Sequence, residues 1–126
     1  MFQVISTKDA PAAIGPYSQG IVVNGMLFAS GQIPIHPETG ELETGDIKAQ
    51  AELVCKNIGA LLAAAGTDYA KVVKTTCFLA DMDDFSAFNE VYAGYFTGKP
   101  ARSCVAVKTL PKGVKCEVEL IAAVEE

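Results

Sequence analysis

The sequence predicts a single α+β domain in which a mixed β-sheet carries two helices on one face. Three observations lead to this prediction: strand-like runs rich in β-branched and aromatic residues, an Asn-Gly pair between two such runs, and two segments with apolar residues at helical spacing. The predicted order is β-β-β-α-β-α-β-β. At 126 residues, without repeats or linkers, the chain has the size of one domain covering 1–126.

The N-terminal part is predicted to hold three strands. Residues 2–5 form a short candidate, and two further strands are expected over about 17–23 and 26–32. Asn24 and Gly25 separate these two strands, and an Asn-Gly pair between apolar runs is the strongest short-range hairpin signal. A polar loop containing two prolines and two glycines follows over 33–45.

The first helix is predicted over about 46–65. Its apolar residues recur at steps of three and four, Asp46 is suited to the N-cap, and Gly66 to the position after the C-terminus. Gly59 lies inside the helix, where glycine costs about 1 kcal/mol relative to alanine. We therefore expect another part of the chain to pack closely against Gly59.

A strand over 72–79 leads into the second helix, which we expect Asp83 or Asp84 to cap and Gly98 and Pro100 to end. Five aromatic residues share one face of this helix: Phe85, Phe88, Tyr92, Tyr95 and Phe96. A stripe of this kind is more often core than a ligand site. Asn89 shares the face, and a buried amide must be hydrogen-bonded. Its partner is the backbone or a ligand, and the residue alone favours the backbone.

Arg102 lies in the next predicted strand, over 100–105. Alternation places Arg102 and Cys104 on one face of that strand. An arginine in an apolar strand needs a partner, and its planar guanidinium binds a carboxylate or phosphate in a bidentate manner. The residue alone is compatible with an anion receptor and with a structural ion pair, of which the ion pair is the more common.

The last strand, over about 115–124, alternates between an apolar face and a face that carries Lys115, Glu117 and Glu119. It follows the Arg102 strand after a short turn, and strands joined in this way usually pair. We therefore expect Glu117 to lie near Arg102, either as its ion-pair partner or in a shared site.

The predicted sheet has one face that this chain does not cover. Two helices cover the first face, while apolar residues remain on the second, and no third layer is encoded. Because such a face is not stable in water, we expect an oligomer whose sheets pack on each other.

Composition narrows the classes of function. The net charge is −5 and no basic cluster occurs, so nucleic acid is an improbable main partner. No membrane span or signal peptide is visible, and we expect a cytoplasmic protein. The four cysteines lack CxxC spacing and His36 is the only histidine, so no metal site is expected and the thiols are expected to be reduced.

Several segments together resemble the RidA/YjgF family of reactive-intermediate deaminases. They cover residues 12–20, 29–34, 73–76, 88–89, 100–105, 110–112 and 114–119, together with Tyr92. The resemblance spans the whole chain, and the motifs are specific in combination. The sequence departs from some relatives over 97–99, where the approach to Pro100 is shorter, which affects the shape of that loop rather than the site.

The resemblance implies a chorismate-mutase-like protomer and a homotrimer with three clefts between subunits. It implies hydrolysis of enamines and imines, such as 2-aminoacrylate and 2-iminobutyrate, to 2-oxoacids and ammonia, without a cofactor. By the same resemblance Arg102 binds the substrate carboxylate and Glu117 positions or activates water. The residues implied to line the cleft are Tyr17, Ser30, Gly31, Asn89 and Cys104, the last through its backbone.

Elementary chemistry agrees with this reading. A protonated imine carbon is already electrophilic, so one anchoring arginine and one carboxylate for water are sufficient. Cys104 has no histidine near it in the motif to activate it as a nucleophile. The rival functions are an endoribonuclease or translation inhibitor, which the acidic charge disfavours, a small-acid-binding regulatory trimer, and a chaperone-like oligomer that leaves the polar residues unexplained.

Overall fold

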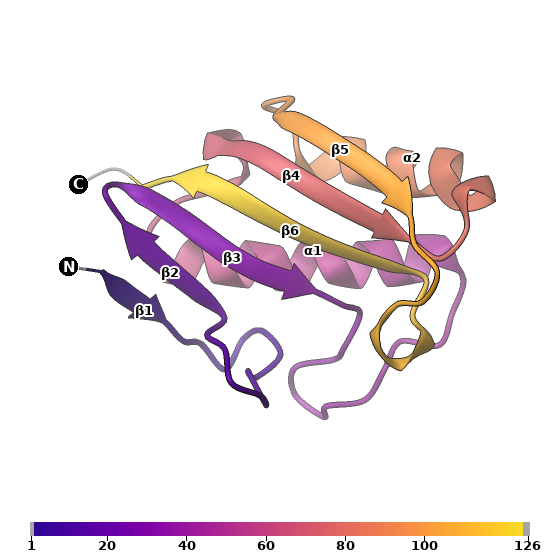
Figure 1. Cartoon of the computed structure of the whole chain (residues 1–126), viewed down its shortest axis with the longest axis horizontal. Coiled ribbons are helices and arrows are strands. Elements are labelled where there is room, and N and C mark those ends of the chain that lie inside the picture. Colours follow the sequence, from indigo (N-terminus) through magenta and orange to yellow (C-terminus); the bar gives the residue numbers. More distant parts are fainter. Residues whose placement is uncertain (1, 125–126) are drawn as a thin grey trace.

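The computed structural model describes residues 2–124 and shows one six-stranded mixed sheet with two helices on one face (Figure 1). The predicted fold class is confirmed. Three short 3-10 turns, at Tyr69–Lys71, Met82–Asp84 and Pro111–Gly113, join some of these elements. The elements are β1 (Gln3–Ile5), β2 (Gly20–Val23), β3 (Met26–Gln32), α1 (Ile47–Ala64), β4 (Val72–Leu79), α2 (Phe85–Tyr95), β5 (Ala101–Ala106) and β6 (Cys116–Ala123).

The hairpin of β2 and β3 forms at the predicted place. Asn24 and Gly25 both have positive φ, 52° and 72°, as a two-residue turn between antiparallel strands requires. β3 has the predicted bounds, whereas β2 begins at Gly20 rather than near residue 17. Tyr17 belongs instead to a loop, where its N–H donates to the Gly15 carbonyl at 2.9 Å.

α1 also begins as predicted. The Asp46 carboxylate accepts a hydrogen bond of 2.9 Å from the Ala49 N–H, which caps the helix. A side chain at Gly59 would overlap with the hydroxyl of Tyr69, and that hydroxyl donates to the Cys55 carbonyl at 2.6 Å. The close packing inferred from Gly59 is therefore present.

The prediction that Asp83 or Asp84 caps α2 is confirmed for the position of Asp84 but not for a side-chain capping bond. Asp84 occupies the N-cap position, but its side chain makes no capping hydrogen bond there. The carboxylate of Asp81 instead accepts from the Asp83 N–H at 2.8 Å, which starts the short turn ahead of the helix. That turn shifts the capping role upstream, because the chain is already helical when it reaches Asp84.

The core lies between the sheet and the two helices. The aromatic stripe of α2 contributes Phe88, Tyr92 and Phe96, all buried. β6 contributes the apolar face that its alternation predicted, with Cys116, Val118, Leu120 and Ala122 buried. These contacts fix α2 against the sheet and so fix the polar residues that the helix carries.

The strand order is β1-β2-β3-β6-β4-β5, so β6 is inserted between β3 and β4. β5 pairs only with β4, to which it runs parallel after the crossover through α2. The expectation that β5 and β6 pair, and that Glu117 therefore lies near Arg102, is wrong. The short turn between them joins strands that β4 separates.

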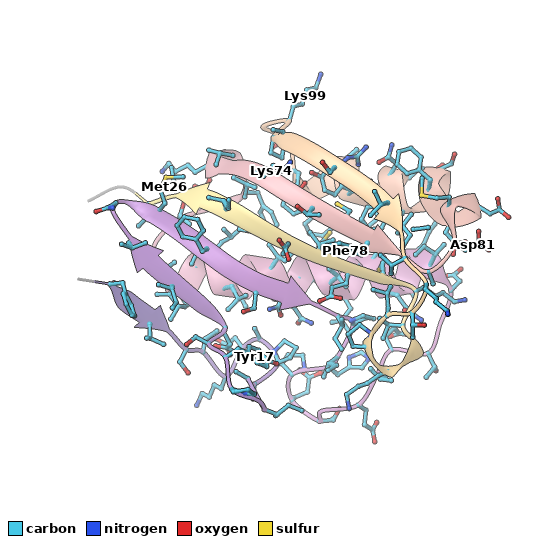
Figure 2. The ribbon with its side chains drawn as sticks, in the orientation of Figure 1. Tyr17, Met26, Lys74, Phe78, Asp81 and Lys99 are labelled. Carbon is cyan, nitrogen blue, oxygen red and sulfur yellow. The ribbon has the colours of Figure 1, made fainter. Side chains whose placement is uncertain are left out.

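The sheet face opposite the helices remains uncovered in the single chain. Both helices lie behind the sheet in Figure 1, and Figure 2 labels Lys74 and Phe78 of β4 on the front. Phe28 and Val105 are 45% and 46% exposed. Coverage of this face by further copies stays a prediction. No helix within residues 2–124 has the length and apolar character needed to cross a bilayer.

Candidate active site

Arg102 lies on the edge strand β5 and is held by side chains of α2. Its Nη1 donates to Asn89 Oδ1 at 2.5 Å, and its guanidinium carbon lies 4.8 Å from the centre of the Tyr92 ring and 5.4 Å from that of Phe85. Contacts of a cation with ring faces at these distances are attractive. The partner of Asn89 is thus Arg102 rather than the backbone.

Tyr92 is itself held in place by Thr75 and Phe96. Its hydroxyl shares a hydrogen bond of 2.6 Å with Thr75 Oγ1 of β4, and its ring stacks on Phe96 with the centres 4.5 Å apart. Since a rigid ring supports one side of the guanidinium and Asn89 holds one of its nitrogens, Arg102 is oriented before any ligand arrives.

The positive charge of Arg102 has no acidic partner within residues 2–124, where none of the ion pairs includes it. The structural ion pair considered from sequence is therefore not formed among the described residues. Arg102 borders a hollow of about 400 Å³ with Asn89, Tyr92 and Lys99. Its donors beyond the Asn89 contact suit a carboxylate. We call Asn89, Tyr92, Arg102 and Cys104 the arginine half-site.

Glu117 lies in a different environment, beside a bulge in β3. The pairing of β3 with β6 shifts register between Ala29 and Gln32, and Ser30 and Gly31 form the irregular stretch. The Glu117 carboxylate occupies the space in which a side chain at position 31 would lie. Only glycine leaves room for it there, and bulges of this kind often redirect side chains next to active sites.

The Glu117 carboxylate makes no hydrogen bond or ion pair with residues 2–124. Partial burial, and then the negative charge of Glu119, raise the pKa of Glu117 above its ordinary value. An unpaired carboxyl group of raised pKa is a stronger base than an ordinary glutamate and is suited to accept and return a proton.

Ser30 fastens the loop before β2 to this bulge. Its Oγ donates to the Ser18 carbonyl at 2.6 Å, and its N–H donates to the Gln19 carbonyl at 2.9 Å. Tyr17 precedes these residues and is 54% exposed. A cavity of about 580 Å³ is lined by Tyr17, Ser30 and Glu117 and by apolar side chains. We call Tyr17, Ser30, Gly31 and Glu117 the glutamate half-site.

Gln19 holds the loop before β2 in place, a role that was not predicted from the sequence. Its buried side chain accepts from the Thr7 N–H at 2.7 Å and donates to the carbonyls of Thr7, Ala10 and Pro11 at 2.7 to 3.3 Å. These bonds hold the loop that forms one wall of the cavity. A glutamine inside an otherwise apolar and small-residue segment was the available signal.

The two half-sites lie on opposite faces of the sheet. Arg102 is in register with Thr75, which is buried beneath the helices, whereas Glu117 is in register with Phe78. Thr75 and Phe78 are three positions apart on β4, so their side chains leave opposite faces. The structure brings Tyr17, Ser30, Gly31 and Glu117 together and places Asn89, Arg102 and Cys104 apart from them.

The thiols and the histidine lie outside this chemistry. Cys55, Cys77 and Cys116 are buried free thiols, and burial raises the pKa of Cys77 and Cys116 to about 12. Cys104 is partly exposed beside Arg102. His36 lies in the loop after β3, with Nε2 3.1 Å from Glu43. Within residues 2–124 no group of His, Cys, Asp and Glu side chains is arranged to hold a metal ion.

Comparisons with known proteins give a consistent result. The family model described as Endoribonuclease L-PSP matches residues 7–124. The 2-iminobutanoate/2-iminopropanoate deaminase of Mus musculus is 49% identical over 121 residues, which are 95% of this chain and 90% of that protein.

Solved structures are similar over their full length. A protein of unknown function of the conserved Rid family from Yersinia pestis, YyfA, is 54% identical with a TM-score of 0.96, covering 98% of this chain and 100% of that one. The TdcF protein of E. coli with bound serine is 45% identical with a TM-score of 0.92, covering 98% and 99%.

Proposed function

The chain belongs to the Endoribonuclease L-PSP family, also called the RidA/YjgF family, and on this basis we propose that it hydrolyses 2-imino acids to 2-oxoacids and ammonia. The proposed substrates include 2-aminoacrylate and 2-iminobutyrate. The observation that carries the proposal is the pair of half-sites: an oriented arginine and a carboxylate of raised pKa, neither of which has an ionic partner within residues 2–124. A 2-imino acid carries a carboxylate that Arg102 could bind and an electrophilic carbon that a water molecule held by Glu117 could attack.

We propose that the two half-sites meet between neighbouring copies in a homotrimer. Because they lie on opposite faces of one sheet, a single chain cannot present both to one small molecule. The exposed apolar side chains of the uncovered face support assembly through that face. Each cleft would then combine the arginine half-site of one copy with the glutamate half-site of the next.

In the proposed reaction, Arg102 binds the substrate carboxylate while Asn89 keeps the guanidinium in place. Glu117 removes a proton from a water molecule as its oxygen bonds to the carbon of the protonated imine. Glu117 then returns the proton to the nitrogen of the resulting amino alcohol, the C–N bond breaks with release of ammonia, and the hydroxyl proton passes back to the Glu117 carboxylate or to the departing ammonia as the carbonyl forms. An enamine substrate first takes a proton on its terminal carbon. Fixed positions of water and substrate supply much of the rate.

A coupled assay tests this function. A pyridoxal-phosphate-dependent dehydratase supplies the imine continuously, and release of the 2-oxoacid is followed with and without this protein. We expect the protein to accelerate release above the spontaneous rate in buffer, and Arg102→Ala at equal concentration to remove the acceleration. Spontaneous kinetics with the folded, oligomeric wild-type protein would refute the proposal.

A receptor for small acids is the second candidate, because the TdcF relative is described with bound serine. A receptor would bind amino or oxo acids through Arg102 without turnover, so the same assay separates the two functions. The endoribonuclease activity in the family's description is less compatible with this chain, whose net charge is −5 and whose basic residues are scattered.

A further inference from the structure

Ser30 has a hydroxyl whose hydrogen is already engaged. Its Oγ lies 2.6 Å from the carbonyl oxygen of Ser18, and a carbonyl oxygen has no hydrogen to give. Ser30 is therefore the donor in this contact. Ser30 also lines the cavity, and with its hydrogen engaged its hydroxyl can offer a ligand there only its lone pairs. A ligand atom that approaches it favourably has to bring an N–H or O–H.

The position of this acceptor is fixed. The Ser30 N–H donates to the Gln19 carbonyl, and the four side-chain hydrogen bonds of Gln19 hold the preceding loop in place. The next residue, Gly31, lies directly under the Glu117 carboxylate. Ser30 and Glu117 thus place two kinds of acceptor side by side at the bulge. Among the donors in the lining, the amides of Gln19 and Gln32 already donate to backbone carbonyls, and Tyr17 and Lys112 are exposed residues.

We propose that Ser30 recognises the protonated nitrogen of the substrate, so that the site takes the 2-iminium acid with its N–H directed at Ser30 Oγ. This inference rests on the proposed function and specifies the form of the substrate that the same site binds. The arginine half-site then binds the negative end of a zwitterion and the glutamate half-site its positive end. After hydrolysis, the carbonyl oxygen of the product meets the lone pairs of Ser30, which favours its release.

Two probes with one carbon skeleton test the proposal. The zwitterion 2-aminobutyrate brings N–H donors, whereas 2-oxobutyrate brings only a carbonyl acceptor at the same carbon. Their dissociation constants are measured by calorimetry for the wild type and for Ser30→Ala. We expect Ser30→Ala to weaken 2-aminobutyrate by roughly tenfold or more, the effect of one hydrogen bond to a charged group, and not to weaken 2-oxobutyrate.

Ser30→Thr and Ser30→Val form a matched pair, because they have nearly the same shape and differ by one hydroxyl. Thr is expected to retain the wild-type preference and Val to lose it, which keeps the test informative if Ser30→Ala does not fold. Ser86→Ala, which removes an exposed hydroxyl on α2, is the control for the chemical change itself.

Three results would overturn the inference. If Ser30→Ala weakened binding of both probes equally, Ser30 would only hold the loop in place. Unchanged affinities would show that Ser30 does not contact the ligand. A wild type without measurable affinity for 2-aminobutyrate would exclude recognition of the nitrogen. Failure of the proposed function looks different: the wild type would bind 2-aminobutyrate through Ser30 and yet leave imine hydrolysis at the spontaneous rate.

Discussion

Arg102 is held by three side chains of one packed helix, whereas Glu117 rests on bare backbone at a bulge and has no hydrogen-bonding partner within residues 2–124. Asn89, Tyr92 and Phe85 are neutral, so they orient the guanidinium without cancelling its charge. Around Glu117, partial burial and a second carboxylate act against ionisation instead.

We propose that the difference corresponds to two tasks. A group that anchors a ligand benefits from a fixed orientation and a full charge, which rigid elements and neutral partners provide. A group that exchanges a proton benefits from a charged form that is less strongly favoured over the neutral form, and partial desolvation acts in that direction. The five predictions that follow test this contrast, beginning with the largest expected effect.

Glu117→Gln keeps the shape of the side chain and removes the proton acceptor. We expect kcat for imine hydrolysis to fall by roughly 10²–10⁴, the usual contribution of general acid–base catalysis. Binding of 2-oxobutyrate is expected to stay near the wild-type value, because Arg102 is intact. Steady-state kinetics and calorimetry measure the two quantities. Full activity in this variant would assign water activation to another group.

Arg102→Ala is expected to weaken both turnover and binding. Breaking a buried hydrogen-bonded charge pair costs roughly 2–5 kcal/mol, which is about 30-fold to several thousand-fold in kcat/KM. Arg102→Lys should restore only part of this loss, since an ammonium lacks the planar set of donors. Normal turnover in a folded, oligomeric Arg102→Ala protein would make the arginine structural.

Gly31→Ala tests the seat of Glu117 without changing either charged residue. The new methyl group would overlap with the carboxylate, which must rotate away from the bulge. A misplacement of about 1 Å can lower the rate up to about 100-fold. We expect kcat to fall while the thermal midpoint changes little, because the carboxylate is the far end of a flexible side chain. Unchanged kcat would separate Glu117 from the reaction.

Mixing the two inactive variants tests whether the half-sites come from different chains. Arg102→Ala and Glu117→Gln proteins are refolded together in equal amounts. With random assembly, each intact half-site is present in half of the copies, so about one cleft in four combines two intact halves. Activity should rise to about a quarter of the wild-type value. No rise after verified co-assembly would place both halves in one chain.

Glu119→Gln is expected to have the smallest effect, a displacement of the pH profile. The charge of Glu119 raises the pKa of Glu117, so its removal lowers that pKa. Glu117 acts as a base only when ionised, and the acidic limb of kcat/KM should therefore move to lower pH. The rate on the plateau should change little. An unmoved limb would show that burial alone sets the pKa of Glu117.

Local features of the fold were predictable from the sequence because they depend on neighbouring residues. The Asn24-Gly25 turn, the Asp46 cap and the buried face of β6 follow from backbone preference and periodicity. The place of β6 was not predictable in this way. Its pairing with β3 and β4 is decided by contacts between residues far apart in the chain, which a short connecting turn does not reveal.

The candidate site divides in the same manner. The residue types were predictable, because an arginine in an apolar strand and a carboxylate on a polar strand face each imply a partner. Their separation was not, since it depends on which strand lies between them. The bulge at Ser30 and Gly31 was also missed, although a glycine inside a strand can signal one, because Gly31 alone does not show where the pairing with β6 shifts.

The distribution of the four thiols has a practical consequence. Cys55, Cys77 and Cys116 are buried in the core, where burial raises their pKa values and keeps the thiols unreactive. Cys104 is partly exposed and lies on β5, the strand that also carries Arg102. An alkylating reagent would therefore mark one place in the native protein. A fluorophore attached to Cys104 would report occupancy of the arginine half-site in real time. Protection of Cys104 from alkylation by a bound acid would locate the ligand without any mutation.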